Sequence, residues 1–209
     1  MFRHWGILIR RRKMDVLLID GGYLRASFRG LDKKYNRSEI VEFARNLSQS
    51  PDFCADKTIY YDCPQYRGRQ QKPISGEIET FQASDKWLND LAQENGFAVR
   101  RGQLKFRGWT LKNQTRLRPA SLQDSDFRPV FEQKGVDMRL GLDIAEFCEM
   151  RSTHHIILVS GDTDLIPAMK KARKAGIKVG IIEFEEEPTG PLHDTLKMHA
   201  DYCTMIKLA

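Results

Sequence analysis

Short apolar runs that end at small or acidic residues alternate along this chain with segments whose apolar residues recur at helical spacing. Residues 14–19 and 155–159 are nearly continuous and rich in Val, Ile and Leu, which indicates strands buried on both faces. Apolar positions from Leu165 to Ala175 then recur at helical spacing, and Gly176 ends them. A strand followed at once by a helix is half of a βαβ unit, so the pattern predicts an α/β domain.

The rest of the pattern extends this order of elements. Ser38 is expected to cap a helix that ends before Pro51, and the polar residues 67–75 are expected to form a loop. We expect further strands over residues 58–61, 97–106, 178–184 and, at an edge, 202–206, and further helices over residues 77–94 and 134–150 and from Pro191 onward. Together these elements predict a doubly wound, mainly parallel sheet with helices on both faces, in one domain over residues 14–209.

Composition narrows the class of protein. A length of 209 residues suits one domain, and the formal net charge of +6 favours a polyanionic partner. The four cysteines lie far apart without a Cys-x-x-Cys pair, so they indicate reduced thiols and neither a disulfide framework nor a zinc site. No apolar run approaches the length of a membrane span, and residues 5–9 are too few for a signal peptide. We therefore expect a cytoplasmic protein whose basic residues 1–13 form a disordered arm.

Residues 100–128 are strongly basic and rich in turn formers, and cations alternate there with aromatic residues. One interpretation is a solvated hairpin inserted in the domain. The other is a ribbon that follows a phosphate backbone and stacks bases, with RNA as the expected partner and single-stranded DNA as an alternative. Under the second interpretation, the candidate RNA-binding residues are Arg100, Arg101, Lys105, Arg107, Trp109, Lys112, Arg116 and Arg118.

Four aspartates stand where predicted elements meet. Asp20 follows the first strand, Asp137 opens a helix, and Asp162 and Asp164 follow residues 155–159. Each of them could simply cap a helix or a turn. However, right-handed crossovers bring the carboxyl ends of parallel strands to one edge, and the first and fourth strands are neighbours at the usual switch point. We therefore expect these four carboxylates to lie close together.

Carboxylates that lie close together repel one another unless a hard cation neutralises them. Oxygen ligands without cysteine or histidine indicate Mg²⁺ or Mn²⁺ as the cofactor. Asp143 is a further candidate ligand, six positions beyond Asp137 on the same predicted helix. Because six residues do not return to the same face of a regular helix, Asp143 ranks as a secondary candidate, with a structural role as the alternative.

At this point the sequence resembles a known family. The segments Val16-Leu17-Leu18-Ile19-Asp20-Gly21, Lys134-Gly135-Val136-Asp137 and Ser160-Gly161-Asp162-Thr163-Asp164 are similar, in this order, to motifs of the NYN domain and its LabA-like branch, within the PIN-like nucleases. The resemblance covers roughly residues 14–206. It implies a doubly wound α/β fold and a metal-dependent ribonuclease site with Asp20, Asp137, Asp162 and Asp164 in the acidic positions. One residue departs from the pattern, because Tyr23 stands where many members have Asn.

The leading hypothesis is therefore a Mg²⁺- or Mn²⁺-dependent endoribonuclease, in which the aspartates hold the ion that activates water and neutralises the scissile phosphate. Such chemistry needs no histidine base, so His154, His155, His193 and His199 are expected to be structural or solvated. One alternative is a haloacid-dehalogenase-like phosphatase, but that chemistry requires a second carboxylate two positions after the first, and position 22 is Gly. The other alternative is a catalytically silent RNA-binding module of the same fold.

Overall fold

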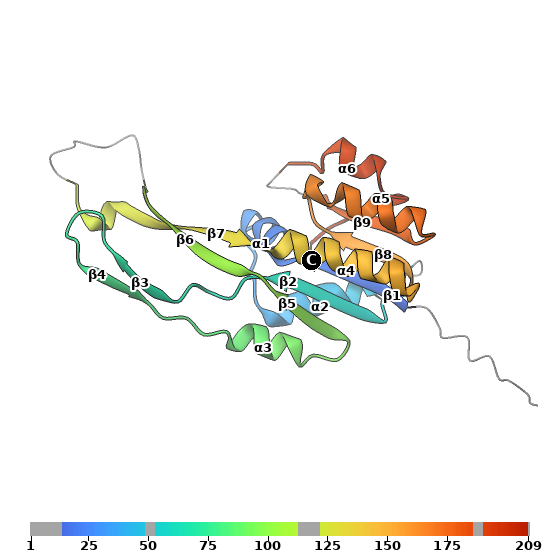
Figure 1. Cartoon of the computed structure of the whole chain (residues 1–209), viewed down its shortest axis with the longest axis horizontal. Helices are drawn as coiled ribbons and strands as arrows, with labels where there is room; N and C mark the ends of the chain where they lie inside the picture. Colours follow the sequence, from blue (N-terminus) through green and yellow to red (C-terminus); the bar gives the residue numbers. More distant parts are fainter. Residues whose placement is uncertain (1–13, 49–52, 113–121, 186–189, 209) are drawn as a thin grey trace, which may run out of the picture.

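The computed structural model describes residues 14–48, 53–112, 122–185 and 190–208 (Figure 1). Within this part of the chain, six parallel strands form one sheet in the order β10-β9-β8-β1-β2-β5. The strands are β1 (Met14–Asp20), β2 (Lys57–Asp62), β5 (Phe97–Arg101), β8 (Thr153–Val159), β9 (Lys178–Phe184) and β10 (Tyr202–Ile206). No helix in the described ranges is long and apolar enough to cross a membrane.

The chain starts in the middle of the sheet and leaves it in two directions. β1 pairs with β2 on one side and with β8 on the other, so that Asp20 lies opposite Tyr61 and Ile19 lies opposite Val159. The order of the strands reverses between β1 and β8, which makes their carboxyl ends the switch point of a doubly wound sheet. The predicted fold class and the predicted pairing of these two strands are therefore confirmed.

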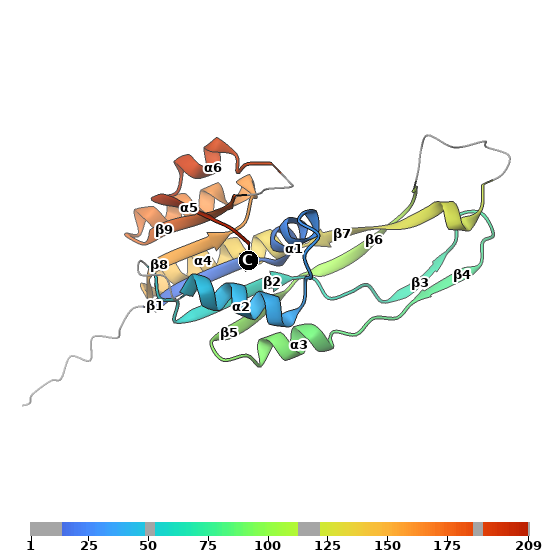
Figure 2. The same cartoon turned by 180° about the vertical axis from the view of Figure 1, so that it is seen from behind.

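Helices cover both faces of the sheet (Figures 1 and 2). One face carries α1 (Gly21–Gly30), α2 (Arg37–Ser48) and α3 (Lys86–Ala92), and the other carries α4 (Val136–Met150), α5 (Ile166–Lys174) and α6 (Asp194–Met198). Alternate residues of β1 enter the two cores, since Leu18 packs on the α4 side and Leu17 on the α1 side, both without exposure. Burial on both faces explains why the strands are continuous apolar runs.

Two hairpins project from the sheet as an arm (Figures 1 and 2). They are formed by β3 (Gly68–Gln71) with β4 (Ile78–Phe81) and by β6 (Gln103–Leu111) with β7 (Phe127–Lys134). Aromatic rings from both hairpins and the preceding segment pack together with centroids 5.3–6.3 Å apart. These rings belong to Tyr66, Phe81, Phe106, Trp109 and Phe131, which we call the arm cluster.

The arm accounts for the main errors of the sequence prediction. The helix expected over residues 77–94 is wrong, because its first part is β4 and only Lys86–Ala92 are helical. The expected loop over residues 67–75 contains β3. Outside the arm, the sequence did not predict α1. Residues 97–106 form two strands instead of one. Their break is at Gly102, where a Cβ would lie 2.7 Å from the carbonyl oxygen of Lys134, and any side chain would force the two segments apart.

Candidate functional site

Asp20 is the last residue of β1 and caps the amino end of α1. Its Oδ1 accepts hydrogen bonds from the backbone N–H groups of Gly22 (2.8 Å) and Tyr23 (3.2 Å). Its Oδ2 accepts a hydrogen bond from the Ser160 hydroxyl (3.2 Å), which is fully buried just beyond β8. The capping role that the sequence allowed is therefore real. The same carboxylate also joins the ends of the two strands at the switch point.

The other three aspartates gather around this junction. The Ser160 hydroxyl also accepts a hydrogen bond from the backbone N–H of Asp162 (3.2 Å). Asp162 caps a short 3₁₀ turn, η4 (Thr163–Leu165), by accepting a hydrogen bond from the N–H of Asp164 (2.8 Å). Asp137 lies in the first turn of α4, and α4 packs against η4.

Electrostatic coupling links the four carboxylates. Burial raises the pKa of Asp20 from its ordinary 3.8 to about 6, and the negative charge of Asp137 adds to the rise, while the hydrogen bonds from Tyr23, Gly22 and Ser160 oppose it. Burial also raises the pKa of Asp137, with further contributions from the charges of Asp162 and Asp164. Ionising all four groups therefore costs free energy that a nearby cation would recover.

An open cavity of about 410 Å³ lies beside the aspartates. Its lining comes from β1, α1, β7, the end of β8 and the segment before α6, and consists of Asp20, Gly22, Tyr23, Gln133, Gly161, Asp162, Gly190, Pro191, Leu192 and His193. A Cβ at position 161 would lie 2.9 Å from the Tyr23 ring, so only glycine allows this close approach. His193 Nδ1 accepts a hydrogen bond from the N–H of Thr195 (3.2 Å) and caps α6.

The donor set suits a hard cation, although its side chains do not converge on one point. In the residues that the structure describes, no three His, Cys, Asp or Glu side chains are placed to hold one ion as they stand. Asp20 and Asp162 direct carboxylate oxygens at backbone N–H groups instead. Nevertheless, the set offers only oxygen ligands, and burial and mutual repulsion raise the pKa of two of its members. These are the properties that Mg²⁺ or Mn²⁺ would satisfy once the carboxylates turn toward it.

Comparison with known families identifies the chain. Its sequence matches the NYN domain over residues 16–206, a range that includes all four aspartates. The chain belongs to the NYN domain family. NYN domains are PIN-like nucleases, so the predicted membership is confirmed at this level. Comparison with curated proteins and with solved structures gave no match.

Asp62 is a buried carboxylate of this NYN domain that the sequence interpretation missed. It ends β2 with no exposed surface and forms an ion pair with Arg25 of α1. It also accepts hydrogen bonds from the Tyr60 hydroxyl (3.0 Å) and from Gln133 Nε2 (3.0 Å). A signal was present, because residues 58–61 form an apolar strand that delivers Asp62 to the same edge as the other aspartates. Gln133 connects this group to the cavity beside Asp20.

Asp143 lies apart from the coupled aspartates. Its Oδ2 accepts hydrogen bonds from the Tyr61 hydroxyl (2.8 Å) and from Arg100 Nε (2.9 Å). These contacts tie α4 to β2 and β5. Asp143 therefore supports the packing of the NYN fold, and a role for it as a metal ligand stays a prediction.

The basic side chains between positions 100 and 128 are distributed over two places. Arg100 pairs with Asp143 and Arg101 donates to Asn89, both on the sheet, whereas Lys105, Arg107 and Lys112 are exposed on the arm. Arg107 forms an ion pair with Glu132 on the neighbouring strand. Arg116 and Arg118 lie outside the described residues.

Trp109 has a structural role in the arm. Its indole N–H donates to the carbonyl oxygen of Gln71 (2.7 Å), and its ring packs against Phe81 and Phe106 in the arm cluster. Cations and aromatics alternate on β6 because one face of the strand packs on β3 and β4 while the other faces solvent. This packing explains the alternation without a nucleic acid, so base stacking by Trp109 stays a prediction.

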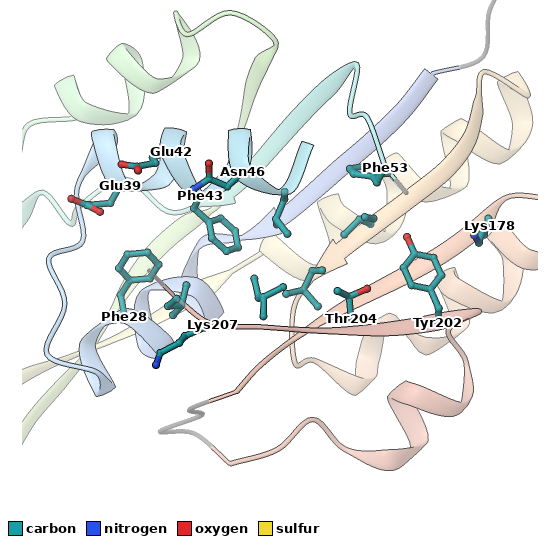
Figure 3. A pocket seen from close by; sticks show the side chains of 15 residues that line it. Phe28, Glu39, Glu42, Phe43, Asn46, Phe53, Lys178, Tyr202, Thr204 and Lys207 are labelled. Atoms are coloured by element: carbon teal, nitrogen blue, oxygen red, sulfur yellow. The ribbon is translucent and has the colours of Figure 1, made fainter. Parts of the chain in front are cut away.

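A second cavity, larger than the one beside Asp20, lies away from the aspartates. It measures about 710 Å³ and lies between α2 and the β8-β9-β10 half of the sheet (Figure 3). Its walls are apolar, with Phe28 and Phe43 from the helices, and its rim is mixed in charge, with Glu39, Glu42 and Lys178. None of the four coupled aspartates lines it.

Proposed function

We propose that this NYN domain, of the LabA-like branch, is a Mg²⁺- or Mn²⁺-dependent ribonuclease that hydrolyses RNA phosphodiester bonds. Asp20, Asp137, Asp162 and Asp164 would hold the ion. Bound there, it would lower the pKa of water and neutralise charge on the scissile phosphate. The observation that carries the proposal is the coupling of these carboxylates at the switch point of the sheet. Burial and the charge of Asp137 raise the pKa of Asp20, and burial and the charges of Asp162 and Asp164 raise the pKa of Asp137.

The residues of the chain have separate tasks in this proposal. Ser160 holds Asp20 and the backbone of Asp162 together, so the two strand ends keep a constant spacing. Gln133 lines the cavity and is held in place by its hydrogen bond to the buried Asp62. His193 is engaged in capping α6, and we assign it no proton transfer. Hydrolysis by water without a histidine base should leave 5′-phosphate and 3′-hydroxyl ends.

The test compares Asp137→Asn with Asp143→Asn in the cleavage of a mixed RNA pool with Mn²⁺. Asn keeps the size of the side chain but removes a charge from the ion's ligands at position 137 only. Cleavage by Asp137→Asn should collapse, by about 100-fold or more if the ion supplies several kcal/mol of stabilisation. Asp143→Asn should retain distinctly more activity.

Two outcomes would overturn the nuclease assignment. One is substantial cleavage by Asp137→Asn, and the other is unchanged cleavage by the wild type in excess chelator. Fragments that carry cyclic phosphates instead of 5′-phosphates would contradict the water-based chemistry. RNA binding without metal should hold or tighten in Asp137→Asn, because this substitution removes one negative charge near the phosphate backbone.

A second function, a catalytically silent RNA-binding module, is favoured by two observations. Asp20 and Asp162 both use carboxylate oxygens for capping. In addition, Tyr23, where many family members have Asn, stacks its ring on Phe184 with centroids 5.7 Å apart and supplies no side-chain amide to the site. A protein that binds RNA but neither binds Mn²⁺ nor cleaves would support this second function over the first.

A further inference from the structure

A pocket rich in arginine lies on the face of the sheet that carries α1, α2 and α3. Its volume is about 460 Å³, and Arg25, Arg29, Arg37, Tyr35 and Trp87 form most of its lining. Arg25 and Arg29 come from α1, Arg37 is the first residue of α2, and Trp87 belongs to α3. We call it the arginine pocket.

Two side chains of the arginine pocket contact the residue that follows Asp20 in the chain. The Tyr35 hydroxyl donates to the carbonyl oxygen of Gly21 (3.2 Å), and Arg25 donates to the same oxygen (3.5 Å). Arg25 also pairs with Asp62, whose other oxygen accepts from Gln133 in the cavity beside Asp20. Gly21 and Asp62 therefore connect the linings of the two cavities, so an RNA strand held at the aspartates could continue toward the arginine pocket.

The charge of the arginine pocket is opposite to that of the aspartate cavity. Its described lining contains three arginines and no aspartate or glutamate. Buried Asp62 neutralises Arg25, and Arg37 lies 3.7 Å from Glu94 with half of its side chain exposed. Arg29 is exposed beside them. Arg29 and Arg37 are therefore available to a phosphate, which guanidinium groups bind through two parallel hydrogen bonds.

The pocket also offers flat aromatic surface. Trp87 is only partly buried and meets Tyr60 edge-on, with centroids 6.0 Å apart. Burial raises the pKa of both Tyr35 and Tyr60, so their hydroxyls stay protonated and hydrogen-bonded inside the wall. A partly exposed indole beside arginines suits a nucleobase, because stacking on an aromatic ring tolerates any base.

We propose that the arginine pocket binds one nucleotide of single-stranded RNA, next to the phosphate that sits at the aspartates. Arg29 and Arg37 hold its phosphate, and Trp87 stacks on its base. The choice of RNA as ligand rests on the proposed function. The four aspartates by themselves repel the RNA backbone. A phosphate held by the arginines would offset this repulsion and would keep the RNA strand next to the aspartates.

The test measures the binding of a 12-nucleotide single-stranded RNA of mixed sequence by fluorescence anisotropy, in EDTA at several salt concentrations. Arg29→Gln/Arg37→Gln should raise the Kd at least about 10-fold and reduce the slope of log Kd against log salt by about 0.7, the change expected for the loss of one phosphate contact on a single strand. The control Lys170→Gln/Lys174→Gln removes two exposed charges from α5 on the other face. Its Kd and slope should stay close to wild type. Equal weakening in both double variants would overturn the proposal.

A second measurement addresses the base. RNA should quench the tryptophan fluorescence of the wild type, and Trp87→Phe should abolish most of this quenching. Quenching that is unchanged in Trp87→Phe would overturn the stacking on Trp87. Neither measurement involves metal or cleavage, so failure of the arginine pocket is distinguishable from failure of the nuclease assignment, which depends on Asp137→Asn and chelator.

Discussion

Replacing Asp20 by Asn should stabilise the metal-free protein at neutral pH. The pKa of Asp20 is raised from 3.8 to about 6, so the folded state binds the proton more tightly than the unfolded state does. The corresponding stability is fully present below pH 3.8 and disappears as the pH rises through 6. A rise of about two pH units at ~1.36 kcal/mol each sets an upper limit of about 3 kcal/mol on the cost of ionised Asp20.

Asn is a close substitute because it keeps the contacts of the cap. Its amide oxygen can accept from Gly22 and Tyr23 as Oδ1 does, and its amide N–H can donate to the Ser160 oxygen. The variant therefore removes the charge with little change in packing. Its free energy of unfolding should exceed that of the wild type at about pH 7.5 by up to ~3 kcal/mol, with the difference falling to about 1 kcal/mol at pH 4.5 and vanishing only below about pH 3.8.

The assay is urea denaturation followed by tryptophan fluorescence, in EDTA, at pH 4.5, 6 and 7.5. Asp143→Asn is the matched control, because its carboxylate accepts from Tyr61 and Arg100, and its removal should destabilise the fold. Adding Mn²⁺ at pH 7.5 should stabilise the wild type more than Asp20→Asn. If Asp20→Asn is less stable than the wild type at pH 7.5 by the same amount as at pH 4.5, the charge of Asp20 is not costly and the reasoning fails.

Three further changes probe the support of the site and the arm. Arg25→Met should lower the free energy of unfolding by about 3 kcal/mol, because it leaves Asp62 buried without its ion-pair partner, while Arg29→Met should cost little; urea denaturation of both variants checks this. Gly21→Ala should destabilise the protein by about 1–3 kcal/mol, because a Cβ there would clash with the Tyr60 hydroxyl. An unchanged melting temperature would show that the Tyr60 side chain moves aside at little cost. Arg107→Gln/Lys112→Gln should weaken RNA binding and flatten its salt dependence by about 0.7 of slope for each single-strand phosphate that these side chains bind, and wild-type affinity and slope would show that the arm does not bind RNA.

Local pattern was sufficient for the sheet and for the aspartates at its edge. A strand buried on both faces must be apolar along its whole length, so β1, β8 and β9 were visible as runs in the sequence. Parallel strands present their carboxyl ends on one edge, which placed Asp20 and Asp162 together from the order of the elements. The sequence alone therefore determined the fold class and the position of the acidic cluster.

Tertiary structure decided the arm and the arginine pocket. Ile78 and Phe81 have apolar spacing that suits a helix as well as a strand, and the packing of Phe81 against Phe106 and Phe131 from a distant hairpin selects the strand. The arginine pocket joins residues of α1, α2 and α3 that are up to 62 positions apart and share no motif. Contacts between residues so distant in sequence leave no local pattern, because each residue is chosen for a neighbour that only the folded chain provides.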